Sequence, residues 1–386
     1  MADRSALREV AALAVKLGFT AFGGPAAHIA MLRHEAVEQR AWLDDKHFVD
    51  LLGMTNLIPG PNSTELVIHV GYERAGWRGL IAAGLGFILP AASITVALAW
   101  LYVEYGSRPA ARDVLYGVQP VIIAIVVQAI WNLGKTALIG PARIAIAIAI
   151  VGLYLLGVNE ILLLAGGALA PLLVMLSRRG SGQATAFEIL PLGAVGSGLV
   201  AIAVAADAVV SYSATRLFLT FLKIGSVLYG SGYVLLAFLR SDFVERYGWL
   251  TEQQLLDAVA VGQFTPGPVF TTATFVGYVT GGFWGAVVAT VGIFLPAFLF
   301  VAVTNPLLPK LRQSATISAL LDGVNVAAIG LMAAVSITLG RAAIVDVWTA
   351  MLAVGAFGLL LRYKINSAWL VLIGGGVGVL RYILTS

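Results

Sequence analysis

The stretch Leu57-Ile58-Pro59-Gly60-Pro61-Asn62-Ser63-Thr64-Glu65 interrupts an apolar run that is otherwise long enough to cross a membrane. Proline has no backbone N–H, fixes φ and biases the residue before it away from helical angles. A helix that reaches Ile58 must therefore end near Gly60 and start again with Pro61 in its first turn, where proline is tolerated. The restarted helix presents unpaired N–H groups and the positive end of its dipole, which predict an anion site. The pattern returns 207 residues later as Phe264-Thr265-Pro266-Gly267-Pro268.

The composition is that of a polytopic membrane protein. Of the 386 residues, 59% are hydrophobic and only 11% are charged, which leaves too few polar residues to cover a soluble domain. The net charge of +4 is better explained by loops that orient membrane helices than by a nucleic-acid surface, so we expect no nucleic acid as a partner. The absence of cysteine excludes disulfides and thiolate metal sites.

Thirteen apolar stretches of spanning length are separated by charged residues or by proline and glycine. They predict an all-α polytopic membrane protein. The stretches that contain Gly23-Gly24-Pro25 and Pro59-Gly60-Pro61 are either continuous or re-entrant. The predicted stretches are 7–31, 48–72, 78–103, 115–136, 141–158, 160–177, 187–210, 213–238, 254–279, 281–304, 320–340, 343–361 and 366–384.

Residues 16–61 and 223–268 are copies of one sequence. Their alignment without a gap gives 14 identical pairs in 46 positions, and with one residue deleted it continues to Leu133-Gly134-Lys135 and Leu339-Gly340-Arg341. Such self-similarity indicates a duplication. We therefore divide the chain into a first repeat (1–178), a linker with one transmembrane helix (179–212) and a second repeat (213–386).

The basic residues indicate how the two repeats are oriented. With a cytoplasmic N-terminus and thirteen spans, 14 basic residues fall on the cytoplasmic side and 8 on the outer side. If 187–210 did not span, the distribution would be 11 to 11. The positive-inside rule therefore favours repeats of inverted topology.

An inverted duplication with a proline break in each half is typical of secondary transporters, whose site lies near the midplane where the halves meet. Each half supplies one helix N-terminus, and small hydroxyl and amide groups complete an anion site. The alternative is that each Pro-Gly-Pro is a structural kink held by neighbouring helices. The candidate substrate-binding residues at the breaks are Gly23, Gly24, Asn56, Pro59, Gly60, Pro61, Asn62, Ser63, Thr64, Gly230, Gln263, Thr265, Pro266, Gly267, Pro268 and Thr271.

Lys16 and Lys223 are intramembrane lysines at equivalent positions of the repeats. Burying a cation in hydrocarbon costs about 3 kcal/mol or more, so such residues face a cavity or a partner. They either attract a dianion, as further substrate-binding residues, or snorkel to an interface. The equivalent charges beside the following loop are expected to form gate contacts or ion pairs: Arg33, Glu38, Arg240 and Glu245.

Glu65 has no acidic counterpart in the second repeat. It either carries a proton or caps its own helix N-terminus, where a carboxylate is favourable. His69 lies one turn further on the same face and completes a conceivable proton relay. The sequence has no Walker-A loop and no histidine or cysteine spacing of a metal site, so we expect no enzyme, no metal and no cofactor.

Several motifs resemble those of the bacterial chromate transporter family. They are Phe22-Gly23-Gly24-Pro25, Trp42-Leu43 and Asn56-Leu57-Ile58-Pro59-Gly60-Pro61, with their echoes in the second half, Gly248-Trp249-Leu250 and Gln263-Phe264-Thr265-Pro266-Gly267-Pro268. The resemblance covers nearly the whole chain. It implies a plasma-membrane carrier with inverted halves that exports chromate, with sulfate as a structural mimic. The second half departs from the first at Ser231-Gly232 and Val269-Phe270, which suggests that the first half does more of the binding.

We therefore expect a multi-pass carrier in the bacterial inner membrane, with a cytoplasmic N-terminus, that moves a tetrahedral oxyanion by alternating access. Its partners are a chromate-like or sulfate-like oxyanion and the lipid bilayer. The alternatives are an anion channel, an inward sulfate permease and a membrane enzyme acting on a lipid phosphate, which would need a nucleophile or metal cluster. The sequence leaves the oligomeric state open between a monomer and a homodimer.

Overall fold

The computed structural model describes the backbone of residues 4–179, 211–229, 232, 234–304, 315–363 and 365–385, and the side chains of these residues except 171–179 and 315–319. Within these ranges the chain is helical and contains no β-strand. The expected linking span 187–210 and the candidate residue Gly230 lie outside the described residues.

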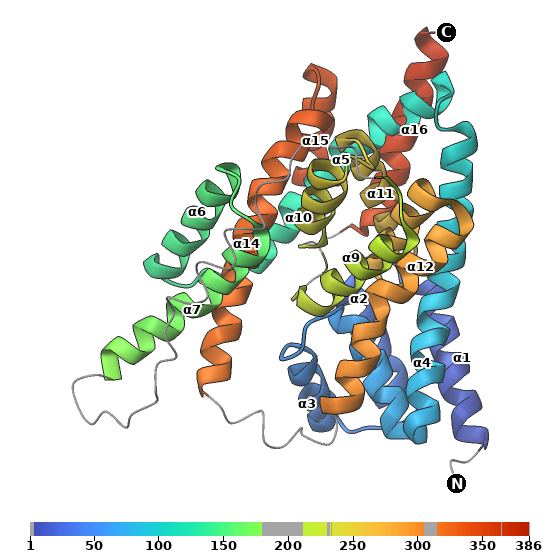
Figure 1. Cartoon of the computed structure of the whole chain (residues 1–386). Coiled ribbons are helices and arrows are strands. Elements are labelled where there is room, and N and C mark those ends of the chain that lie inside the picture. Colours follow the sequence, from blue (N-terminus) through green and yellow to red (C-terminus); the bar gives the residue numbers. More distant parts are fainter. Residues whose placement is uncertain are drawn as a thin grey trace.

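The elements of the first repeat recur in the second in the same order (Figure 1). The first repeat contains α1 (Arg4–Thr20), α2 (Pro25–Arg33), the π-helical turn η1 (His34–Gln39), α3 (Asp45–Thr55), α4 (Asn62–Tyr105), α5 (Pro109–Ala137), α6 (Pro141–Leu155) and α7 (Glu160–Arg179). The second contains α9 (Ala214–Val227), α10 (Leu235–Leu239), η3 (Arg240–Arg246), α11 (Glu252–Phe264), η4 (Val269–Thr271), α12 (Thr272–Thr304), α14 (Ala315–Ala343), α15 (Val347–Tyr363) and α16 (Ser367–Thr385).

The first helix of each repeat folds back on itself instead of continuing across the predicted span. Gly23 and Gly24 hold φ at +104° and +76°, which glycine adopts without steric cost, and Pro25 then starts α2. The return brings Lys16 to 2.6 Å from Glu35. The stretch 7–31, which the sequence left either continuous or re-entrant, is therefore two helices between which the chain reverses, and 213–238 is divided between α9 and α10.

The Pro59-Gly60-Pro61 stretch also ends one helix and begins another that runs back beside it. His47, near the start of α3, lies 3.7 Å from Glu73, so α3 and the beginning of α4 are antiparallel. This reversal is what the re-entrant alternative for the stretch 48–72 requires of the chain. The stretch 254–279 is divided likewise, because α11 ends at Phe264 and η4 begins at Val269.

A second reversal divides α4 and α12 into a short arm and a long arm. Non-helical angles occur at Ala75 and Gly76 in α4 and, almost unchanged, at Gly281 and Gly282 in α12. The arms touch through glycine: a Cβ added to Gly71 would lie 2.5 Å from the carbonyl oxygen of Gly79. Close approach of two helices through small residues is typical of membrane proteins.

The two repeats exchange helices and are not separate bodies. The long arms of α4 and α12 pack together in opposite directions, since Gly84 lies against Phe298 while Leu80 shares an apolar cluster with Val301. The helix α5 packs against α15 and α16 of the second repeat, and α14 packs against α6 and α7 of the first. Figure 1 shows α6 and α7 beside α14, and α16 beside α5.

Five helices among the described residues are long and apolar enough to cross a membrane. Large apolar side chains cover the outside of the molecule, such as Ile148 at 66% and Trp284 at 73% exposure, as expected of a surface that faces lipid. The thirteen predicted stretches are thus not thirteen continuous helices, because prolines and glycines divide several of them. The five spans are Asn62–Tyr105, Pro109–Ala137, Val269–Thr304, Leu320–Ala343 and Ser367–Thr385.

Candidate functional site

The two proline-glycine breaks lock the repeats together through a reciprocal pair of backbone hydrogen bonds. The Gly60 N–H donates to the Leu228 carbonyl at 2.7 Å, and the Gly267 N–H donates to the Ala21 carbonyl at 3.0 Å. Leu228 follows α9 and Ala21 follows α1, so both bonds join equivalent positions of the repeats. Each break therefore satisfies a carbonyl at the end of the other repeat's first helix. These two amides are consequently not free to bind an anion in this conformation.

His28 connects this junction to the start of α4. Its Nε2 lies 2.9 Å from the Ala21 carbonyl oxygen, which only accepts, so Nε2 carries the proton. Its Nδ1 lies 3.2 Å from Ser63 Oγ, and in the neutral imidazole Ser63 donates to it. The ring is buried and meets Phe87 edge to face, with centroids 5.5 Å apart. The sequence analysis missed His28 because it looked for metal-ligand spacing; its position three residues after Gly23-Gly24-Pro25 was the available signal.

The first turn of α4 contains buried polar atoms without a hydrogen-bond partner in the described part of the chain. They are Asn62 Oδ1, Thr64 Oγ1 and both carboxylate oxygens of Glu65. The Asn62 amide nitrogen donates to Asn56 Oδ1 at 2.7 Å. An unsatisfied buried polar group costs about 1–3 kcal/mol, so this turn is a natural place for a polar ligand.

One of the two alternatives from the sequence was that Glu65 caps its own helix. In the structure it does not, because both of its carboxylate oxygens lack a hydrogen-bond partner among the described residues. The start of α4 has no side-chain cap hydrogen bond, and Glu65 is fully buried. Its Oε1 lies directly over Gly60, only 2.2 Å from where a Cβ on Gly60 would be. His69 is equally buried, one turn further along α4.

The second break satisfies its own hydroxyl groups. Thr265 donates to the Val261 carbonyl at 2.7 Å, and Thr271 donates to the Pro268 carbonyl at 2.9 Å. Gln263 is buried beside this break. The unpaired polar atoms of α4 thus have no equivalent among these threonines, which agrees with the departure of Val269-Phe270 from Asn62-Ser63.

Lys16 and Lys223 both form ion pairs with acidic residues at equivalent positions. Lys16 lies 2.6 Å from Glu35, and Lys223 lies 2.5 Å from Asp242. Hydrogen bonds from Lys16 and then Arg40 hold the pKa of the Glu35 carboxyl below its ordinary value, against the effect of burial. The sequence alignment overlooked this pair of acids because glutamate and aspartate do not count as identical.

Arg33 and Arg240 fasten the loops that follow the first hairpins. Each pairs with the acidic residue five positions later, Arg33 with Glu38 and Arg240 with Glu245. Each also pairs with the first turn of the next helix, at Asp45 and Glu252: 2.5 Å for Arg33 and 2.8 Å for Arg240. The Asp45 hydrogen bond raises the pKa of Arg33.

A basic cleft of about 450 Å³ opens beside Lys223. Arg216 and Arg246 line it with Lys223, and Asp242 is the acidic group that pairs with Lys223 and, at 3.8 Å, with Arg246. The charges of these four groups sum to a positive value, and hydroxyls from Thr220 and other side chains line the same cleft. Cationic clefts of this kind concentrate anions.

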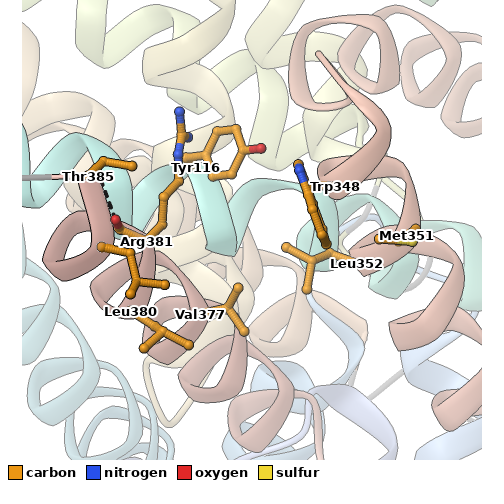
Figure 2. A pocket seen from close by; sticks show the side chains of 9 residues that line it. Tyr116, Trp348, Met351, Leu352, Val377, Leu380, Arg381 and Thr385 are labelled. Carbon is orange, nitrogen blue, oxygen red and sulfur yellow. Dashed lines mark hydrogen bonds between the residues drawn. The ribbon is translucent and has the colours of Figure 1, made fainter.

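An apolar groove of about 580 Å³ lies between α5, α15 and α16 (Figure 2). Its cation, Arg381, lies 3.6 Å above the Tyr116 ring and 3.5 Å from Asp113, so its charge is already balanced. We therefore assign the groove to the lipid-facing surface rather than to an anion site. The described residues contain no cluster of histidine, cysteine and acidic side chains that could hold a metal ion.

The comparisons with known proteins match this duplicated architecture. A family model described as chromate transporter matches residues 8–172 and 215–379. The chromate transport protein of Pseudomonas aeruginosa is 36% identical over 379 residues, which cover 95% of this chain and 91% of that protein. The chromate transport protein of Cupriavidus metallidurans is 33% identical over 386 residues (97% and 93%). The probable chromate transport protein of Synechococcus elongatus is 31% identical over 364 residues (93% and 91%).

No solved structure gives a significant match to the chain. The family model, however, matches twice, once in each half, and the relatives share almost the full length. This chain, a helical membrane protein whose two halves both match the family model, therefore belongs to the chromate transporter family.

Proposed function

We propose that the chain is a secondary carrier that exports chromate, with sulfate as a structural mimic, through the bacterial plasma membrane by alternating access. Family membership supports transport of chromate, and the five long apolar helices support a multi-pass location. The N-terminus is cytoplasmic in this proposal, which no longer rests on the positive-inside count, because that count treated 7–31 and 213–238 as continuous spans and the structure divides both. The observation that carries the mechanism is the reciprocal bonding of Gly60 to Leu228 and Gly267 to Ala21.

Those two bonds support alternating access because they join half-helix ends of opposite repeats. The long arms of α4 and α12 run antiparallel, as expected of repeats with inverted topology. A rocking motion of one repeat against the other would open the junction toward one side while it closes toward the other. An open channel would not need two hydrogen bonds that hold the breaks of the two repeats together in this way.

In the proposed site, chromate binds at the first turn of α4. The candidate hydrogen-bond donors are the Thr64 hydroxyl and the second N–H of the Asn62 amide, whose other N–H donates to Asn56, and the helix N-terminus adds its dipole. The basic cleft at Lys223 would concentrate the dianion before it reaches the breaks. An inside-negative potential expels two negative charges with about 4.6 kcal/mol per 100 mV, so export needs no ATP.

Glu65 and His69 are the candidates for proton coupling at this site. An ionised Glu65 would repel a dianion bound in the same turn, so protonation of Glu65 would favour chromate binding. We expect Glu65→Gln to make chromate binding less dependent on pH, measured by binding of labelled chromate to the purified protein. A pH profile identical to that of the parent would remove Glu65 from the site.

The test of the function is uptake of labelled chromate and labelled sulfate into everted vesicles, with and without a proton gradient. A carrier gives saturable uptake that is stimulated by unlabelled chromate on the opposite side. Flux without saturation or exchange would instead support an anion channel. Concentrative flux of sulfate toward the cytoplasm in right-side-out vesicles would support an inward permease.

A further inference from the structure

Asp257 on α11 is a buried carboxylate that belongs to neither break. It is only 1% exposed, and each of its oxygens accepts one hydrogen bond at 2.8 Å, Oδ2 from the Tyr102 hydroxyl and Oδ1 from the Gln119 amide. Tyr102 lies at the end of α4 and Gln119 in α5, whereas α11 belongs to the second repeat. The carboxylate thus holds two helices of one repeat against one helix of the other.

A cavity of about 660 Å³ reaches this carboxylate from outside. Polar side chains from the loop before α5 and from the start of α11 line it, among them Ser107, Thr251 and Gln254. Its volume is many times that of a water molecule, and its polar lining can hold water. Glu65 differs, because it lines neither this cavity nor the basic cleft at Lys223.

Few titratable groups line this cavity beside Asp257. Tyr102 from α4 and exposed Arg112 from α5 are the titratable residues that line the cavity with Asp257. α12 contributes Val279, and no described residue of α14 or α16, which also pack against α11, lines it. The hydrogen bonds from Tyr102 and Gln119 are therefore the main interactions that stabilise the charged form of Asp257, which burial disfavours.

We propose that Asp257 binds and releases one proton in each transport cycle and thereby controls the contact between the repeats. A hydronium ion in the cavity gives its proton to one carboxylate oxygen and leaves as water. The protonated oxygen no longer accepts a hydrogen bond as a carboxylate does, so α11 is released from α4 and α5. Loss of the proton to water re-forms the contact. This inference rests on the proposed carrier function.

The sequence differs at the equivalent place in the first repeat. Asp50 is equivalent to Asp257, but the repeat alignment puts Leu308, whose side chain has no hydroxyl, opposite Tyr102. Asp50→Asn is therefore the matched control for Asp257→Asn. Both changes remove one carboxylate and leave its size almost the same.

The experiment uses the full chain in liposomes and labelled chromate. Two rates are measured: chromate exchange at equal pH on both sides, and net chromate flux driven by a pH gradient. We expect Asp257→Asn to keep the exchange rate of the parent and to lose all stimulation by the gradient, while Asp50→Asn keeps both. Stimulation that survives in Asp257→Asn overturns the inference, as does loss of exchange in a variant that remains monodisperse.

Tyr102→Phe keeps the inference testable if Asp257→Asn does not fold. It removes one donor to the carboxylate and so favours its protonated form. We expect its pH profile of net flux to move to higher pH, and an unmoved profile overturns the inference. A parent protein that exchanges chromate without any response to the gradient contradicts this inference alone. A parent without chromate exchange contradicts the proposed function instead.

Discussion

Gly60 and Gly267 occupy backbone conformations, at φ +136° and +86°, that residues with a side chain rarely adopt. Their surroundings differ. A Cβ on Gly60 would meet the end of the Glu65 side chain, which can move, whereas a Cβ on Gly267 would lie 2.7 Å from the Cβ of Ala91, which is fixed to α4. The two halves of one symmetric junction therefore tolerate change unequally.

We predict that Gly267→Ala lowers the thermal midpoint of the purified protein more than Gly60→Ala does. Each substitution introduces a backbone strain of about 1–3 kcal/mol, and Gly267→Ala adds the clash with Ala91. Thermal unfolding in detergent measures the difference. Gly152→Ala is the control, because that helical glycine has open space around its missing Cβ. Equal midpoints for both variants at the junction would contradict the geometry described for Gly267.

The His28 bridge gives a second prediction at this scale. His28→Leu introduces the residue that the second repeat has at the equivalent position, Leu235, and removes hydrogen bonds to Ala21 and Ser63. We expect a loss of about 1–3 kcal/mol in unfolding free energy. Ser63→Ala should cost little more once His28 is replaced, because the two residues share one bond. Additive losses in the double variant would show that the bond contributes nothing.

At the scale of elements, the sequence analysis located each interruption but not the direction in which the chain continues. Proline and glycine identify where a helix must end, so the breaks at Gly23-Gly24 and Pro59-Gly60-Pro61 were predictable. The reversal depends on contacts between residues far apart in the sequence, such as Lys16 with Glu35 and His47 with Glu73. Those pairs become apparent only once the hairpins are formed.

The α1–α2 hairpin gives a prediction about acid stability. The pKa of Glu35 is lowered in the folded protein, so its carboxylate stabilises the fold above its unfolded pKa, near the ordinary 4.5, and this stabilisation is lost as pH falls through the folded pKa. Lys16→Met removes the main cause of the shift. We therefore expect its thermal midpoint to begin to fall at a higher pH than that of the parent.

Thermal midpoints measured between about pH 7 and about pH 3 test this expectation. Lys46→Met on α3 is the control, because it also removes one exposed lysine but leaves the Lys16–Glu35 pair in place. If the two variants have the same acid profile, the ion pair does not stabilise the hairpin.

At the scale of the whole molecule, the duplication and the helical class were predictable, since 14 identical pairs in 46 positions need no structure to interpret. The exchange of helices was not. Nothing in the sequence of α5 indicates that it packs against α15 and α16 of the other repeat, because apolar helix faces carry little information about their partners. The partners of Asp257 were unpredictable for the same reason, because Tyr102 and Gln119 come from distant segments.

The exchange predicts how the chain behaves when it is divided. Two separately encoded pieces, 1–186 and 187–386, should each be degraded when expressed alone, because α5 and α14 would lose the helices that cover them. Expressed together, they should copurify and restore chromate export. Immunoblots and copurification of tagged pieces measure this. A first piece that is stable alone would contradict the exchanged packing.

The paired hydrogen bonds at Gly60 and Gly267 also limit how the two repeats can move relative to each other. Each bond joins the break of one repeat to the end of the other repeat's first helix, so a rocking motion of the repeats must stretch one or the other. The two bonds are unequal: without Gly267 the Ala21 carbonyl keeps His28 Nε2–H as a donor, whereas without Gly60 the Leu228 carbonyl loses the backbone donor that it has here. The junction should therefore open at lower cost on its Gly267 side than on its Gly60 side.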